Sequence, residues 1–189
     1  MGIVFRRRTK MLRGGFALAG VLALCALAGV VALCAGAGAA QASSTTPAQC
    51  AAKAPIELPV NAWAPARKEL APPGARAIRL CRYNALGTRP PRGLARSALV
   101  TSNAAVKAIV SELDQLPPIP RGLFCPVDDG AEIEALLAYA GGNGVVVQID
   151  LSGCGAISNG SVVRWAGSTE AGRELLAQTE ELTGYRPKS

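Results

Sequence analysis

The chain has 189 residues, with 20 lysines and arginines against 13 aspartates and glutamates, and it contains no histidine. Histidine is the usual catalytic base near neutral pH. Its absence excludes hydrolases built on a Ser–His or Cys–His pair, and it removes the usual nitrogen ligand of zinc.

Residues 1–42 have the three parts of a secretory signal peptide. Five basic residues precede an apolar run over residues 16–35, and small residues then lead to Ala40, Gln41 and Ala42. This Ala-x-Ala pattern predicts cleavage after Ala42. The alternative is a membrane anchor, because residues 16–35 are long enough to cross a bilayer, which would leave the following domain outside.

The charge of the chain depends strongly on this segment. Cleavage would leave 147 residues, enough for one domain, with 15 basic and 13 acidic side chains. The formal charge would fall from +7 to +2, so the basic composition does not indicate nucleic acid as a partner. Residues 53–121 still carry 11 basic and 4 acidic groups, whereas residues 122–189 carry 4 and 9. Either the basic half binds an anionic wall polymer or membrane surface, or the two halves face each other.

Residues 43–74 are predicted to form a tether and a proline-rich N-terminal arm, because five prolines prevent long regular elements there. We expect Trp63 and Leu70 to hold this arm on a single domain of residues 75–184, followed by a tail of residues 185–189. Strands are predicted at residues 75–83 and 94–100. A helix is predicted at residues 102–115, with a buried stripe of Val106, Ile109, Val110, Leu113 and Leu116.

The second half of the chain predicts a β-hairpin. Its strands are residues 131–140 and 145–153, joined by a Gly/Asn turn. Pairing of Tyr139 with Val145 would place Gly130 opposite Cys154. A further strand is predicted after a turn at residues 158–160, and a last helix ends at Gly184. The expected fold is α+β, an antiparallel sheet of about four to five strands with two helices packed on one face.

Four cysteines follow the signal. Cys50, Cys81, Cys125 and Cys154 predict two disulfides, because an even count in an exported chain is typical of them and no Cys-x-x-Cys motif or histidine favours zinc. Three pairings are open. Pairing of neighbours would close two loops of about 30 residues, each contributing roughly 3 to 4 kcal/mol in the chain-entropy model.

Acidic residues around Gly130 are the candidates for chemistry. Asp128 and Asp129 precede it, and Glu132 and Glu134 follow on one face of a predicted strand. Calcium binds several oxygens, but this spacing is not that of a D-x-D-x-D-G loop. Paired carboxylates for glycoside cleavage would need a cleft. We therefore expect the aspartates to form a turn and the glutamates to form a polar strand face, with no metal or cofactor.

Two other residues have competing interpretations. Lys107 is a conceivable base, but lysines in the middle of a helix are usually solvated. Asn159 begins an Asn-Gly-Ser glycosylation motif, although Asn-Gly is also what a tight turn requires, and we favour the turn. The few aromatic residues are scattered, which argues against a stacking platform for nucleic acid or carbohydrate.

The order of these features resembles a known family. A strand with Cys81, a helix, the pair Cys125-Pro126, a hairpin and then Cys154 resemble the subtilisin-inhibitor-like secreted bacterial domains, over about residues 75–166. The resemblance implies an exposed loop braced by Cys125 and Cys154, with Val127 entering the specificity pocket of a serine protease. The predicted helix lacks the cysteine of that family, and two aspartates stand where the family has an apolar residue and a tyrosine.

The predicted function is that of an exported, disulfide-stabilised, non-enzymatic domain of the cell envelope or extracellular space. Its partner would be a protein or an envelope component. The alternative is a protease inhibitor of the subtilisin-inhibitor-like type. In both cases the candidate contact residues are Pro126, Val127, Asp128 and Asp129.

Overall fold

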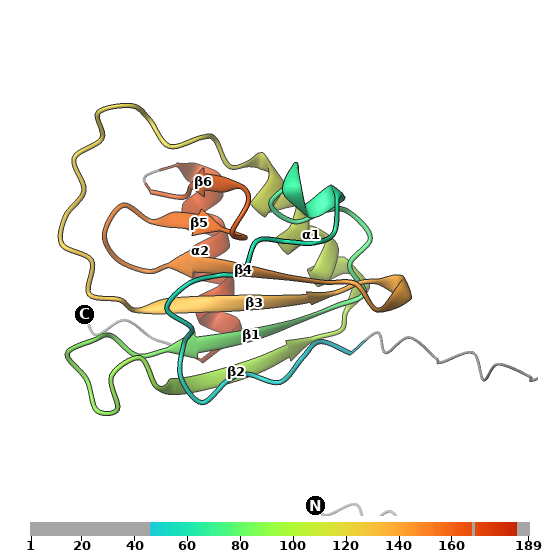
Figure 1. Ribbon diagram of the computed structural model, residues 1–189, viewed down its shortest axis with the longest axis horizontal. Coiled ribbons are helices and arrows are strands. Elements are labelled where there is room, and N and C mark those ends of the chain that lie inside the picture. Colours follow the sequence, from blue (N-terminus) through green and yellow to red (C-terminus); the bar gives the residue numbers. More distant parts are fainter. Residues whose placement is uncertain (1–45, 168, 185–189) are drawn as a thin grey trace, which may run out of the picture. The chain divides into compact units, whose positions relative to one another are not determined.

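The computed structural model describes residues 46–167 and 169–184 (Figure 1). The predicted signal peptide and the tail lie outside the described residues. Every described element belongs to one compact unit, residues 41–189. None of the helices in these ranges is long and apolar enough to cross a membrane.

Six strands form one antiparallel sheet in the order β2-β1-β3-β4-β5-β6. The strands are β1 Ala77–Tyr83, β2 Leu94–Val100, β3 Glu132–Ala138, β4 Gly144–Asp150, β5 Ala156–Ser158 and β6 Val163–Trp165. The helices are α1 Asn103–Gln115 and α2 Glu170–Leu182, with short 3-10 turns η1 Pro65–Arg67 and η2 Ala140–Gly142.

The α+β class is confirmed, but the sheet has six strands and not the predicted four to five. The strand that the sequence pattern missed is β5, which pairs Ile157 with Ile149 of β4. Its residues, Ala156 to Ser158, include one large apolar side chain and show no alternating or β-branched run. This strand forms because Gly153 and Gly155 adopt positive φ angles of 65° and 63°, which turn the chain back onto the sheet.

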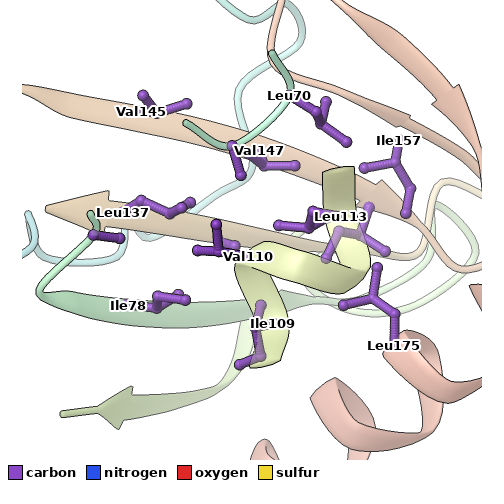
Figure 2. Close-up of a cluster of buried hydrophobic side chains, with 14 of the residues drawn as sticks. Leu70, Ile78, Ile109, Val110, Leu113, Leu137, Val145, Val147, Ile157 and Leu175 are labelled. Carbon is purple, nitrogen blue, oxygen red and sulfur yellow. The ribbon is translucent and has the colours of Figure 1, made fainter. Parts of the chain in front are cut away.

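The main core lies between the sheet and the two helices (Figure 2). The predicted stripe of α1 is buried, and α2 contributes Leu175, which is fully buried. Alternate residues of the central strands face these helices, as the period of two in a strand requires. These strand residues are Ile78, Leu80, Ile133, Ala135, Leu137, Val145, Val147 and Ile149.

The N-terminal arm contributes to the fold at two places. Leu70 is buried in the main core, and Trp63 packs on Tyr139 with ring centroids 4.7 Å apart, so the arm is held as predicted. Residues 46–60 pack against the opposite face of the sheet. There Cys50 forms a disulfide with Cys81 of β1.

Asn159 is a structural residue. Its side chain is 1% exposed, and its Nδ2 donates hydrogen bonds to the carbonyl oxygens of Ala66, Glu69 and Leu70 at 2.8 to 3.0 Å. Its Oδ1 accepts hydrogen bonds from two backbone N–H groups of its own turn. This geometry supports the turn interpretation, because a glycosylated amide would have to reach solvent.

Candidate functional site

The candidate site is the contact loop, residues 117–131, which connects α1 to β3 and contains no helix or strand. Prolines 117, 118 and 120 explain why α1 ends at Gln115, since proline lacks the N–H that a helix needs. Figure 1 shows this loop in yellow, as a long excursion from α1 around to the start of β3.

The loop is fixed at three points. At its start, the Trp165 N–H donates a hydrogen bond of 2.9 Å to the Pro117 carbonyl oxygen. Near its end, Cys125 forms a disulfide with Cys154, with their Cα atoms 4.8 Å apart. The two disulfides are thus those of neighbouring cysteines. At the third point, the Leu86 N–H donates to the Asp129 carbonyl oxygen at 2.7 Å.

Asp128 and Asp129 form the turn that leads into β3. The Oδ1 of Asp128 accepts from the Gly130 N–H at 2.8 Å, and that of Asp129 accepts from the Ala131 N–H at 2.9 Å. The Ser152 hydroxyl lies 2.6 and 2.8 Å from these two oxygens. The hydrogen bonds from Ala131 and Ser152 lower the pKa of Asp129. Both carboxylates are therefore occupied as turn formers.

The predicted register of the hairpin is wrong by two residues. Val145 pairs with Leu137 and not with Tyr139, and the Leu151 N–H donates to the Ala131 carbonyl oxygen. The connection between β3 and β4 is longer than predicted because it contains η2. The Tyr139 N–H closes this connection by donating to the Asn143 carbonyl oxygen. The shifted register places Ser152, and not Cys154, opposite Gly130. Ser152 therefore lies close to both Asp128 and Asp129.

Between its fixed points the loop exposes apolar side chains. Phe124 is 95% exposed and Val127 is 93% exposed, on either side of Cys125 and Pro126. Within the described ranges, residues 118–124 make no hydrogen bond to the rest of the domain. The predicted contact residues, Pro126 to Asp129, are all exposed, and Phe124, which was not among them, is exposed beside them. In the sequence, Phe124 is marked only as an apolar residue between a proline-rich stretch and a cysteine, which does not indicate its exposure.

Glu132 and Glu134 lie on one polar face of β3, as predicted, but this face is buried. They are 2% and 4% exposed, because they share this face with residues 46–60 and with Arg92. Arg92 Nη2 lies 3.2 Å from Glu132 Oε1 and donates to the Pro55 carbonyl oxygen at 2.6 Å. A pair of carboxylates for glycoside cleavage would need a cleft, and this pair is covered.

Burial also changes the acidity of this cluster. Burial is the main cause that raises the pKa of Glu132 to about 7, and the Arg92 guanidinium offsets part of the rise. Burial likewise raises the pKa of Glu134 and of Asp150. Gln148 Nε2 donates to Glu132 Oε2 and to Asp150 Oδ1, both at 3.0 Å. Within the described ranges, no group of three or more acidic or cysteine side chains is arranged to hold a metal ion.

The chain matches no family model, no curated protein and no solved structure. The resemblance to subtilisin-inhibitor-like domains therefore stays a prediction. It rests on the order of the elements and on Cys125-Pro126.

Proposed function

We propose that the protein is an exported, non-enzymatic domain of the cell envelope or extracellular space that binds a protein partner through the contact loop. The observation that carries this proposal is the exposure of Phe124 and Val127 on a loop braced by a disulfide. Two disulfides are typical of proteins outside the reducing cytosol. The signal sequence at residues 1–42 supports the same location.

A braced loop is suited to binding because little chain entropy is lost when it meets a partner. Phenyl and aliphatic side chains can fill an apolar pocket of a protein, where large buried anchors supply most of the affinity. Phe124 and Val127 have no hydrogen-bonding groups for the hydroxyls of a polysaccharide. A protein is therefore the preferred class of partner.

Replacing Phe124 and Val127 together by serine is expected to weaken partner binding by more than about tenfold, because it removes both apolar anchors. The partner is first identified by photo-crosslinking from position 124 of the otherwise unchanged chain, in envelope and culture-medium fractions of the producing cells. Biolayer interferometry with the identified protein then measures the affinities of the wild type and the variant. Thermal unfolding is expected to change little, since neither side chain is buried.

A matched control is available in the N-terminal arm. Ile56 and Val60 are 91% and 73% exposed, so their double serine variant removes similar apolar surface at a distance in sequence from the loop. This control is expected to bind normally. Equal weakening of the control, or crosslinking that does not depend on the loop residues, would contradict the proposal, as would turnover of a peptide or wall polymer by the purified domain.

A second candidate function is inhibition of a serine protease by the same loop. The specific observation in its favour is that Val127 follows Cys125-Pro126 directly and is 93% exposed, while the next two residues are tied to Ser152. An inhibitor loop must enter the protease cleft and yet resist rearrangement after cleavage. A disulfide before Val127 and hydrogen bonds after it would supply that rigidity.

Titration against subtilisin-like and chymotrypsin-like proteases is expected to show stoichiometric inhibition in this case. Val127→Arg should abolish inhibition of proteases with apolar pockets, because an arginine would have to be buried there without a partner. Val60→Arg is the matched control and should inhibit normally. Failure to inhibit any protease of the panel would remove the inhibitor candidate and leave the broader binding proposal standing.

A further inference from the structure

A groove lies along α1, on a part of the molecule that the contact loop does not line. It has a volume of about 680 Å³, within the range of small-molecule sites. One wall is residues 73–76 and the other is a stripe of α1 with the spacing of a single helix face. The α1 residues are Asn103, Val106, Lys107, Val110, Ser111, Asp114 and Gln115.

The groove has an apolar floor and a cationic end. Ala75, Val106 and Val110 are the most buried of its lining residues, at 8%, 1% and 7% exposure. Arg76 and Lys107 are exposed at the end where α1 begins, and neither forms an ion pair with any described residue. Lys107 thus lines the cationic end of the groove and is exposed to solvent.

Two further features make this end electropositive. The first turn of α1 contains no acidic residue, and the Ser102 side chain makes no capping hydrogen bond. The partial positive charge of the helix N-terminus is therefore not neutralised locally. At the other end of the groove, Asp114 Oδ1 accepts a hydrogen bond of 3.2 Å from the Ala71 N–H. The groove is consequently polarised along its length.

The chain enters the described structure at the cationic end. Thr46 and Pro47 line a small hollow together with Arg76, which also lines the groove. The apolar segment 16–35 is separated from Thr46 by only ten residues. Ten residues span at most about 35 Å when fully extended. If the segment were kept as an anchor, the linker alone would therefore let the described domain reach the membrane surface, whereas the cleaved chain would reach it by diffusion.

We propose that this groove binds an anionic phospholipid at the membrane surface, with Arg76 and Lys107 on the phosphate and part of one acyl chain over Ala75, Val106 and Val110. The two cations favour an anionic group at one end of the groove, and the apolar floor favours a hydrocarbon chain beside it. This site is independent of the contact loop. It also gives a role to part of the excess of basic residues in the first half of the domain.

Flotation of residues 43–189 with vesicles tests the proposal, since this fragment contains every described element of the compact unit. We expect binding to vesicles of phosphatidylglycerol and phosphatidylcholine in equal parts, and little binding to phosphatidylcholine alone. The variant Arg76→Glu/Lys107→Glu is expected to bind more than about tenfold less, because each basic residue near an anionic surface contributes about 1 kcal/mol.

Two controls separate the groove from general charge. Lys68→Glu/Arg96→Glu makes the same charge change at two exposed residues that do not line the groove, and it is expected to bind normally. Ser111→Trp keeps the charge but fills the groove, and it is expected to weaken binding several-fold. Phe124→Ser/Val127→Ser should have no effect on flotation.

Several results would overturn the proposal. These are absence of flotation with the anionic vesicles, an equal loss in the Lys68/Arg96 control, and normal binding by Ser111→Trp, which would leave only a diffuse charge effect. Binding of a soluble organic anion or a peptide in the groove, without vesicle binding, would assign it a different occupant.

Discussion

Replacing Cys50 and Cys81 together by alanine is expected to lower the free energy of unfolding by about 3.5 kcal/mol. The disulfide joins residues 31 apart, and in the chain-entropy model a loop of this length restricts the unfolded chain by about that amount. Urea unfolding followed by tryptophan fluorescence measures the change.

The same variant is expected to loosen residues 46–60. Without the disulfide, residues 51–55 keep hydrogen bonds to Tyr83, Arg92 and Leu94, which lie at the end of β1, in the loop before β2 and at the start of β2. Hydrogen exchange should therefore rise in residues 46–60, while the strands of the main core keep their protection.

The other disulfide provides the matched control. Cys125 and Cys154 are 29 residues apart, so their double alanine variant should lose a similar free energy of unfolding. Its faster exchange should appear in the contact loop and not in residues 46–60. Unchanged exchange of residues 46–60 in the Cys50/Cys81 variant would show that packing, and not the disulfide, holds the arm.

Local patterns in the sequence were sufficient to predict the framework of the fold. Alternating residues marked β1, and a β-branched run after a Gly/Asn turn marked β4 and favoured a strand for β3. The spacing of Val106, Ile109, Val110 and Leu113 marked α1. These elements are long enough to show their own period. By contrast, β5 is three residues long and depends on turns at two glycines, so only the tertiary structure defines it.

The candidate site could be predicted only in part, because exposure and burial depend on segments distant in sequence. The turn role of Asp128 and Asp129 follows from local chemistry, and it was predicted. The exposure of Phe124 depends on which surfaces the rest of the chain leaves uncovered, and no local pattern reports it. The burial of Glu132 and Glu134 was not predicted for the same reason, because segments distant in sequence cover their face.

Two ion pairs combine charges from both halves of the chain, one on this covered face and one on the helix-facing side of the sheet. Arg92 pairs with Glu132, and Arg82 of β1 pairs with Glu180 of α2 at 3.6 Å. Both ion pairs join the basic first half to the acidic second half, so the two halves do face each other in part. Arg76 and Lys107 have no such pair among the described residues, which is why the groove remains cationic.

Replacing Glu132 by glutamine is expected to raise the free energy of unfolding by about 3 kcal/mol at pH 8, with little change at pH 4.5. The folded-state pKa of Glu132 is about 7, above its ordinary value of 4.5, so the folded protein holds a proton that the unfolded chain releases. Wild-type stability therefore falls as the pH rises between these values, and each unit of pKa difference corresponds to about 1.4 kcal/mol. Urea unfolding from pH 4.5 to 8 measures both chains.

The variant should retain a weaker slope of the same sign, because burial also raises the pKa values of Glu134 and Asp150 beside it. Glu57→Gln is the matched control, since Glu57 is exposed, and it should unfold like the wild type at every pH. A wild-type chain whose stability rises between pH 5 and 7 would contradict the prediction. That result would mean that Arg92 and Gln148 stabilise the ionised carboxylate by more than its burial costs.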